Sequence, residues 1–136
     1  MTHKSKLCGF IIDCRTDDLA AAADFWGRAL GMEIRALPAE EGEKYVRLVD
    51  RNSELHIEVQ KVDHPSRVHL DIEADDIEAE VRRLESLGAR RVVQEHSHSW
   101  VVMEAPTGQR FCVVRRSSPS FDAQANEWPQ GTALTR

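Results

Sequence analysis

The sequence predicts an α+β fold built from two copies of one βαβββ unit. A strand followed by a capped helix occurs twice, and three short strand-like runs separated by turn residues follow each copy. A chain of 136 residues, of which 41% are hydrophobic, is long enough for one compact domain with a core but too short for two large ones. We therefore expect a single domain over residues 1–116, followed by an extension.

The first copy begins with LCGFIIDCRT, residues 7–16, an apolar and β-branched run typical of a buried strand. Asp17 or Asp18 can cap the start of the next helix, and Gly31 its end. Between the caps, apolar side chains recur at helical spacing: Leu19, Ala22, Ala23, Trp26 and Leu30. Three strand candidates follow, MEIRAL, KYVRLVD and ELHIEVQKV, broken by PAEEGE and DRNS.

The second copy repeats this plan in VHLDIEADDIEAEVRRLESLGA, and a shift of 58 residues lays Asp18 on Asp76 and Phe10 on Val68. Its strand candidates are RRVVQE, SWVVMEA and RFCVVRR, broken by the polar turn HSHS and by PTGQ. We expect module one over about residues 7–62 and module two over about residues 66–116. Neither module can bury both faces of its sheet alone, so the two should pair around a shared core.

The end of the chain differs in composition from the two modules. From Ser117 onward it is rich in Ser, Pro, Asn, Gln and Gly, which predicts an irregular C-terminal extension over residues 117–136. Phe121 and Trp128 are the exceptions, and we expect them to pin the extension to the body or to a second subunit.

Charge and cysteine content limit the possible functions. The net charge is −5 and the arginine pairs are interleaved with acids, which argues against a nucleic-acid partner. Cys8, Cys14 and Cys112 are an odd number without CxxC spacing, as expected for buried free thiols in a reducing cytosol. The first apolar run, residues 7–12, is too short for a signal peptide or a membrane span, so we expect a cytoplasmic protein without a membrane partner.

Three segments together resemble the vicinal oxygen chelate superfamily, the group of glyoxalase I, bleomycin-resistance proteins and extradiol dioxygenases. They are DDLAAAADFWGRALGM, VHLDIEADDIEAEVRRLESLGA and APTGQRFCVV, and the resemblance covers roughly residues 7–116. It implies paired βαβββ modules that form a half-open mixed β-barrel, usually as a homodimer, with the active or binding site inside.

The resemblance also implies where a metal would bind. In metal-dependent members, four strand positions hold one divalent ion through His and Glu ligands, and these positions correspond here to Ile11, Glu58, His69 and Cys112. Ile11 cannot coordinate an ion, and Cys112 is a soft donor that suits zinc better than magnesium, manganese or iron. His69 and Glu58 are thus the candidate metal ligands, with His56 as a further one.

Strand alternation assigns the faces without reference to any family. In each of two strands apolar residues alternate with polar ones, so the apolar set should pack on the helices and the polar set should face a cavity. The alternating polar residues are His56, Glu58 and Gln60 in one strand, and His69, Asp71 and Glu73 in the other.

We expect this protein to bind a small organic molecule in the cavity between its modules, without a tightly bound metal. It would act as a resistance or sequestration protein or as a metal-independent enzyme, and the sequence leaves open whether it is an enzyme. The competing classes are a lyase or dioxygenase that uses a divalent ion (Zn, Mg, Mn, Fe or Ni), and a pure interaction module. The expected ligand-binding residues are His56, Glu58, His69, Trp100, Cys112 and Ile11.

Overall fold

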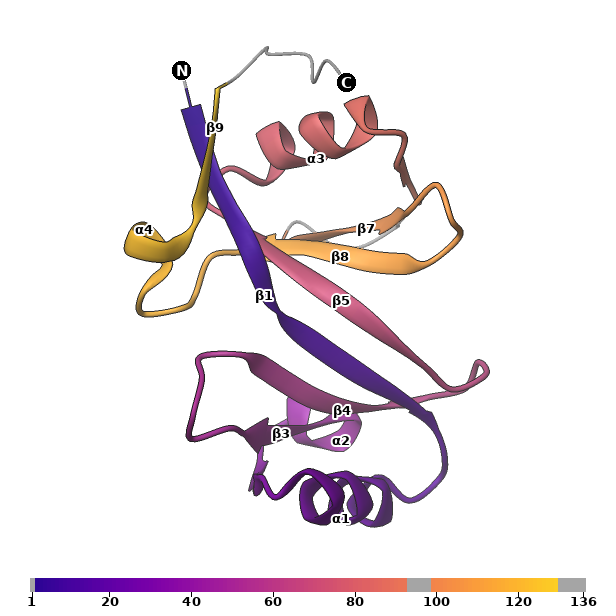
Figure 1. The fold of residues 1–136 in the computed structure, drawn as a ribbon. Helices are drawn as coiled ribbons and strands as arrows, with labels where there is room; N and C mark the ends of the chain where they lie inside the picture. Colours follow the sequence, from indigo (N-terminus) through magenta and orange to yellow (C-terminus); the bar gives the residue numbers. More distant parts are fainter. Residues whose placement is uncertain (1, 93–98, 130–136) are drawn as a thin grey trace. The chain divides into compact units, whose positions relative to one another are not determined.

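A computed structural model describes residues 2–92 and 99–129. The chain divides into two compact units: unit 1 contains residues 1–8 and 70–136, and unit 2 contains residues 9–69. Two long strands, β1 (Thr2–Arg15) and β5 (Arg67–Ala74), each contribute residues to both units (Figure 1).

Unit 2 contains the first strand–helix–three-strand module predicted from the sequence. Its strands lie in the order β2, β3, β4, β1; β1 runs parallel to β4, and the other neighbours are antiparallel. A short helix, α2, replaces part of the turn expected in PAEEGE. Besides the second half of β1, its elements are α1 (Leu19–Leu30), β2 (Glu33–Ala36), α2 (Glu41–Lys44), β3 (Tyr45–Val49) and β4 (His56–Val62).

Helix α1 begins and ends at the residues that the sequence indicated. The Asp18 carboxylate accepts a hydrogen bond from the Ala21 amide at 3.0 Å, and Gly31 closes the helix with a left-handed φ of 68°. The helix packs on one face of the sheet, and Trp26 is among its residues at this contact. The buried residues at this contact are Ile12, Leu48, Ile57 and Val59.

Unit 1 repeats the plan, with strand order β5, β8, β7, β6 and a parallel β5–β8 pair. Helix α3 begins at an Asp76 cap, whose carboxylate accepts from the Ala79 amide at 3.0 Å. The hydrophobic core of unit 1 contains Val81, Met103 and Val113. Most of the predicted HSHS turn lies outside the described residues. The elements after β5 are α3 (Ile77–Ser86), β6 (Arg90–Arg91), β7 (Trp100–Glu104) and β8 (Arg110–Arg115).

The described parts of the two terminal segments, residues 2–8 and 117–129, are more ordered than the sequence suggested. The first strand begins at Thr2 rather than near residue 7, and the tail forms α4 (Phe121–Gln124) and β9 (Asn126–Pro129) instead of an irregular extension. The two corrections have one cause, because β9 pairs antiparallel with residues 2–5 of β1 and each segment supplies the other's backbone hydrogen bonds.

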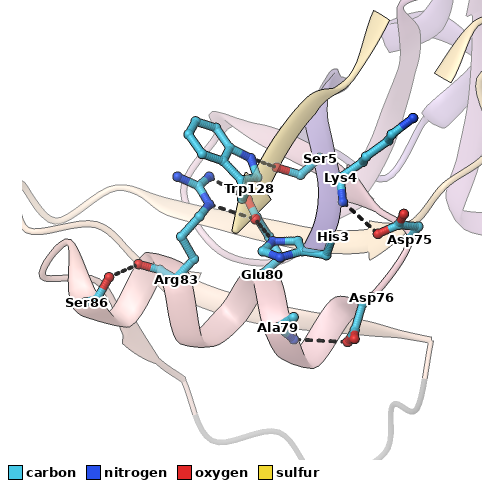
Figure 2. Close-up of polar contacts among 10 residues, drawn as sticks. All are labelled: His3, Lys4, Ser5, Asp75, Asp76, Ala79, Glu80, Arg83, Ser86 and Trp128. Carbon is cyan, nitrogen blue, oxygen red and sulfur yellow. Dashed lines mark hydrogen bonds and ion pairs between the residues drawn. The ribbon is translucent and has the colours of Figure 1, made fainter. Parts of the chain in front are cut away.

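The predicted role of the two tail aromatic residues is confirmed within unit 1. Phe121 is fully buried, and the Trp128 indole donates a hydrogen bond to the Ser5 hydroxyl at 3.0 Å (Figure 2). The Arg83 guanidinium lies 4.0 Å from the centre of the Trp128 ring. The described part of the tail, residues 117–129, is therefore part of the folded body of unit 1.

The predicted α+β class is confirmed, with parallel and antiparallel strands in an open sheet. Cys8, Cys14 and Cys112 are all free thiols. Burial, together with the charge of Glu73, raises the pKa of the Cys8 thiol to about 12. Among the described residues, no helix is long and apolar enough to cross a membrane.

Candidate functional site

The side of the unit 2 sheet opposite α1 carries a set of polar side chains, which we call the polar face. Core residues Leu48, Ile57 and Val59 point toward the helix, so their neighbours along β3 and β4 point the other way. The strand register places these neighbours side by side across the sheet. The polar face consists of Ile11, Asp13, Tyr45, Arg47, His56, Glu58 and Gln60, with His69 in contact with Asp13.

His69, the residue that the sequence singled out most clearly, is held by Asp13. Its Nδ1 lies 2.8 Å from Asp13 Oδ2, and Arg67 Nε lies 3.7 Å from the same oxygen. Asp13 is only 2% exposed. Because a carboxylate can only accept, Nδ1 of His69 donates, and in the neutral ring the lone pair is then on Nε2.

His56 and Glu58 form a second pair on the same face. His56 Nε2 lies 3.1 Å from Glu58 Oε2, and both side chains are partly buried. Glu58 is thus in contact with His56, whereas His69 is in contact with Asp13.

Two further pairs of strand neighbours complete the polar face. Gln60 donates from Nε2 to the Tyr45 hydroxyl at 2.9 Å. Arg47 lies directly opposite Glu58 in the β3–β4 register. The sequence analysis missed Tyr45 and Arg47, although their alternation with Val46 and Leu48 in KYVRLVD carried the same signal as the neighbouring strand.

Two buried polar atoms of this face lack a hydrogen-bond partner among the described residues: Arg47 Nε and Asp13 Oδ1. Buried polar groups are nearly always satisfied in folded proteins, so each such atom calls for an explanation. The polar face therefore offers one donor and one acceptor that the fold itself does not use.

A cavity of about 800 Å³ adjoins this face at the carboxyl ends of β1 and β4. Its size is within the range of cavities that hold small molecules. Gln60 belongs both to the cavity wall and to the polar face. The lining residues are Arg15, Thr16, Asp17, Glu43, Lys44, Gln60, Lys61, Val62, Asp63 and His64.

The predicted ligand-binding residues are distributed over both units. Ile11, His56, Glu58 and His69 belong to unit 2, whereas the other two belong to unit 1. Trp100 lies on β7 and is 42% exposed; Cys112 lies on β8, opposite Asp71 in the β5–β8 register.

Glu73, expected from alternation to face a cavity, has a structural role instead. It is fully buried and accepts hydrogen bonds from the Ser117 and Ser118 amides at 2.8 and 3.0 Å. Burial opposes its ionisation, but these hydrogen bonds and one from the Ser118 hydroxyl outweigh it and lower the pKa of Glu73. Glu73 thus fixes the start of the tail.

The metal-ligand set implied by the family does not fit unit 2. Ile11 and Glu58 are neighbours in the β1–β4 register, but Ile11 is buried and offers only hydrocarbon. Glu58 is thus the one coordinating group of this pair, and it is already in contact with His56.

Residues 9–114 match the family model of the glyoxalase-like domain. The chain belongs to this family. No curated protein matches the sequence. The family match confirms the resemblance to the glyoxalase, bleomycin-resistance and dioxygenase superfamily.

Solved structures support the same fold. Methylmalonyl-CoA epimerase from Mycobacterium tuberculosis is similar with a TM-score of 0.60 and 17% identity, over 86% of this chain and 91% of that one. A glyoxalase/bleomycin resistance protein/dioxygenase superfamily member from Vibrio splendidus 12B01 gives a TM-score of 0.55 and 16% identity, over 82% and 99%. A mutant of 4-hydroxymandelate synthase from Streptomyces coelicolor gives 0.53 and 15%, over 90% and 53%. At these identities the likeness concerns the fold alone.

Proposed function

We propose that this glyoxalase-like protein binds a small organic molecule on the polar face of unit 2, without a tightly bound catalytic metal. The observation that carries the proposal is the polar face itself, where Arg47 Nε and Asp13 Oδ1 are buried without partners. A buried polar atom without a partner costs free energy, and a polar ligand would satisfy both of these atoms. The adjoining cavity of about 800 Å³ supports the proposal with space for such a ligand.

The protein would either sequester this molecule, as in the bleomycin-resistance branch, or convert it in a metal-independent reaction. Neighbours with the same fold include an epimerase, a synthase and a glyoxalase/bleomycin resistance protein/dioxygenase superfamily member, so the fold is compatible with more than one function. The homodimer, the absence of nucleic-acid and membrane partners, and the cytoplasmic location stay predictions.

A thermal-shift screen of the full-length protein with small organic acids, alcohols and amides tests the proposal. At least one compound should raise the melting temperature, and Glu58→Gln should weaken that effect. Glu40→Gln is the matched control, because Glu40 is exposed in the same unit and belongs neither to the polar face nor to the cavity lining. If every compound that binds shifts the melting temperatures of the two variants equally, the ligand does not bind on the polar face.

Metal analysis of untagged protein, purified without chelator, tests the competing function. We expect no stoichiometric metal. A divalent ion that is bound one to one in the wild type and lost in His69→Ala would replace our proposal with a metal-dependent lyase or dioxygenase.

A further inference from the structure

The two unpartnered atoms of the polar face have opposite hydrogen-bonding character. Arg47 Nε is a donor on a permanently charged group, and Asp13 Oδ1 is an acceptor. They lie on β3 and β1, which are separated by β4. Strands in a sheet are about 4.8 Å apart, so the two backbones lie roughly 10 Å apart across the sheet. One small molecule could meet both side chains.

The guanidinium of Arg47 has no anion of its own among the described residues. Its neighbour in register on β4, Glu58, is in contact with His56. Its neighbour on β2, Arg35, is a second cation, and that cation is paired with Glu33 at 3.0 Å. A planar guanidinium matches a carboxylate with two parallel hydrogen bonds, and a carboxylate would supply the missing acceptor.

Asp13 selects for a different group. Its Oδ2 already meets His69 at 2.8 Å and Arg67 at 3.7 Å, whereas Oδ1 is buried and lacks a donor. A ligand that reaches this oxygen must bring a hydrogen-bond donor, and a second carboxylate would be repelled. A hydroxyl group has the required character.

The charges of the polar face also limit the charge of the ligand. Asp13 and Glu58 are acidic, and Arg47 is the cation that the described structure leaves without a partner. One negative charge on the ligand is balanced by Arg47, whereas a phosphate dianion would bring a second charge next to the two carboxylates.

We propose that the polar face binds a small hydroxycarboxylic acid, with its carboxylate on Arg47 and its hydroxyl directed to Asp13 Oδ1. Gln60 is the neighbour of Asp13 in the register and Tyr45 lies opposite Gln60, so these two residues would flank the bound molecule. This inference rests on the proposed function, because it names the class of ligand for the same site.

Calorimetric titration of the full-length protein tests the inference with lactate, 3-hydroxybenzoate and 4-hydroxybenzoate as probes. Each acid is compared with its amide, which keeps the hydroxyl but has no charge, and the two benzoates with benzoate, which has no hydroxyl. At least one hydroxy acid should bind more tightly than its matched compounds. Arg47→Gln should weaken that acid about tenfold or more, as expected for a charge-assisted hydrogen bond, and should leave the amide unchanged.

Arg28→Gln is the matched control. It removes the same charge from an exposed position on α1 in the same unit, and it should leave the affinity unchanged. Arg47→Lys keeps the charge without the fork and should bind at an intermediate level. If Arg47→Gln does not fold, the Nε–H resonance of Arg47 in the wild-type protein is the readout, and it should move on addition of the acid but not of the amide.

Four results would overturn the inference. If the amides bind as tightly as the acids, the ligand carboxylate does not bind Arg47. An affinity that is unchanged in Arg47→Gln has the same meaning. In both cases the proposed small-molecule function stands. Binding of none of the three acids, with neutral compounds still active in the thermal-shift screen, would have the same meaning. If no compound binds in either experiment, both the inference and the proposed function fail.

Discussion

Replacing Glu80 by alanine should strongly destabilise unit 1. Glu80 is fully buried on α3 and accepts from Arg83 Nε at 2.9 Å and Nη2 at 2.8 Å (Figure 2). Its Oε1 also lies 2.7 Å from Nε2 of His3, which is 4% exposed. Alanine would leave Arg83 and His3 without their acceptor inside the protein. Removal of one partner from a buried pair costs about 3–5 kcal/mol of unfolding free energy.

The lower end of this range applies to Glu80. Arg83 is 17% exposed and also stacks on Trp128, so it can turn partly toward water after the substitution. We therefore expect a loss of about 3 kcal/mol, which is a large share of the ~5–15 kcal/mol stability of a typical domain.

Urea unfolding followed by tryptophan fluorescence measures the effect. Glu85→Ala is the matched control, since Glu85 lies on the exposed side of the same helix and its replacement should change the free energy of unfolding by less than about 0.5 kcal/mol. If Glu80→Ala is no more destabilising than Glu85→Ala, the buried network does not hold α3 to the ends of the chain, and our reasoning is wrong.

Two other predictions concern acid stability and strand spacing. Burial opposes the ionisation of Glu73 and Glu80, but hydrogen bonds outweigh it and lower both pKa values from 4.5. The two ionised carboxylates should stabilise the folded protein fully above about pH 4.5, and this stabilisation should be lost as the pH falls through their folded-state pKa values. The melting temperature of the wild type should therefore fall with pH, and that of Glu73→Gln should fall less. A Cβ on Gly9 would lie 1.9 Å from the His56 carbonyl oxygen, so Gly9→Ala should force β1 and β4 apart. A melting temperature that does not fall by several degrees would show that the two strands are not this close.

The parts of the fold that the sequence predicted correctly depend on local signals. Asp18 and Asp76 cap helices because each carboxylate reaches an amide three residues ahead, and Gly31 ends α1 because it adopts a left-handed φ. The apolar spacing between these caps determines which side of each helix is buried. These features can be read from short windows of sequence.

The terminal strands could not be predicted in this way. Residues 2–5 are polar and lack the alternation of a half-buried strand, and β9 lies in a segment with the composition of a loop. They form strands because they pair with each other, His3 with Trp128 and Ser5 with Asn126, across more than 120 residues of chain. His3 also contacts Glu80 on α3, and nothing in the sequence of either terminal segment indicates that this helix is its neighbour.

Prediction of the site was limited by the same difference between local and long-range signals. The alternation along β4 correctly separated His56, Glu58 and Gln60 from the core residues of the strand. Asp13 was a visible anomaly, a carboxylate inside the apolar run FIIDC, but its contact with His69 depends on a residue 56 positions away. The significance of Arg47 depends on the β3–β4 register, which no local pattern specifies.

Arg47 Nε and Asp13 Oδ1 lack partners among the described residues, and this favours a functional over a structural role for the polar face. A buried polar atom without a partner costs about 1–3 kcal/mol, so selection for stability alone would favour an apolar residue at either position. Two buried acids of unit 1, Glu73 and Glu80, differ in this respect, because each holds several hydrogen bonds within the protein. Departures from local consistency are expected at functional sites. These two atoms lie on one face and differ in character, so a ligand that carries a donor and an acceptor of its own would satisfy both.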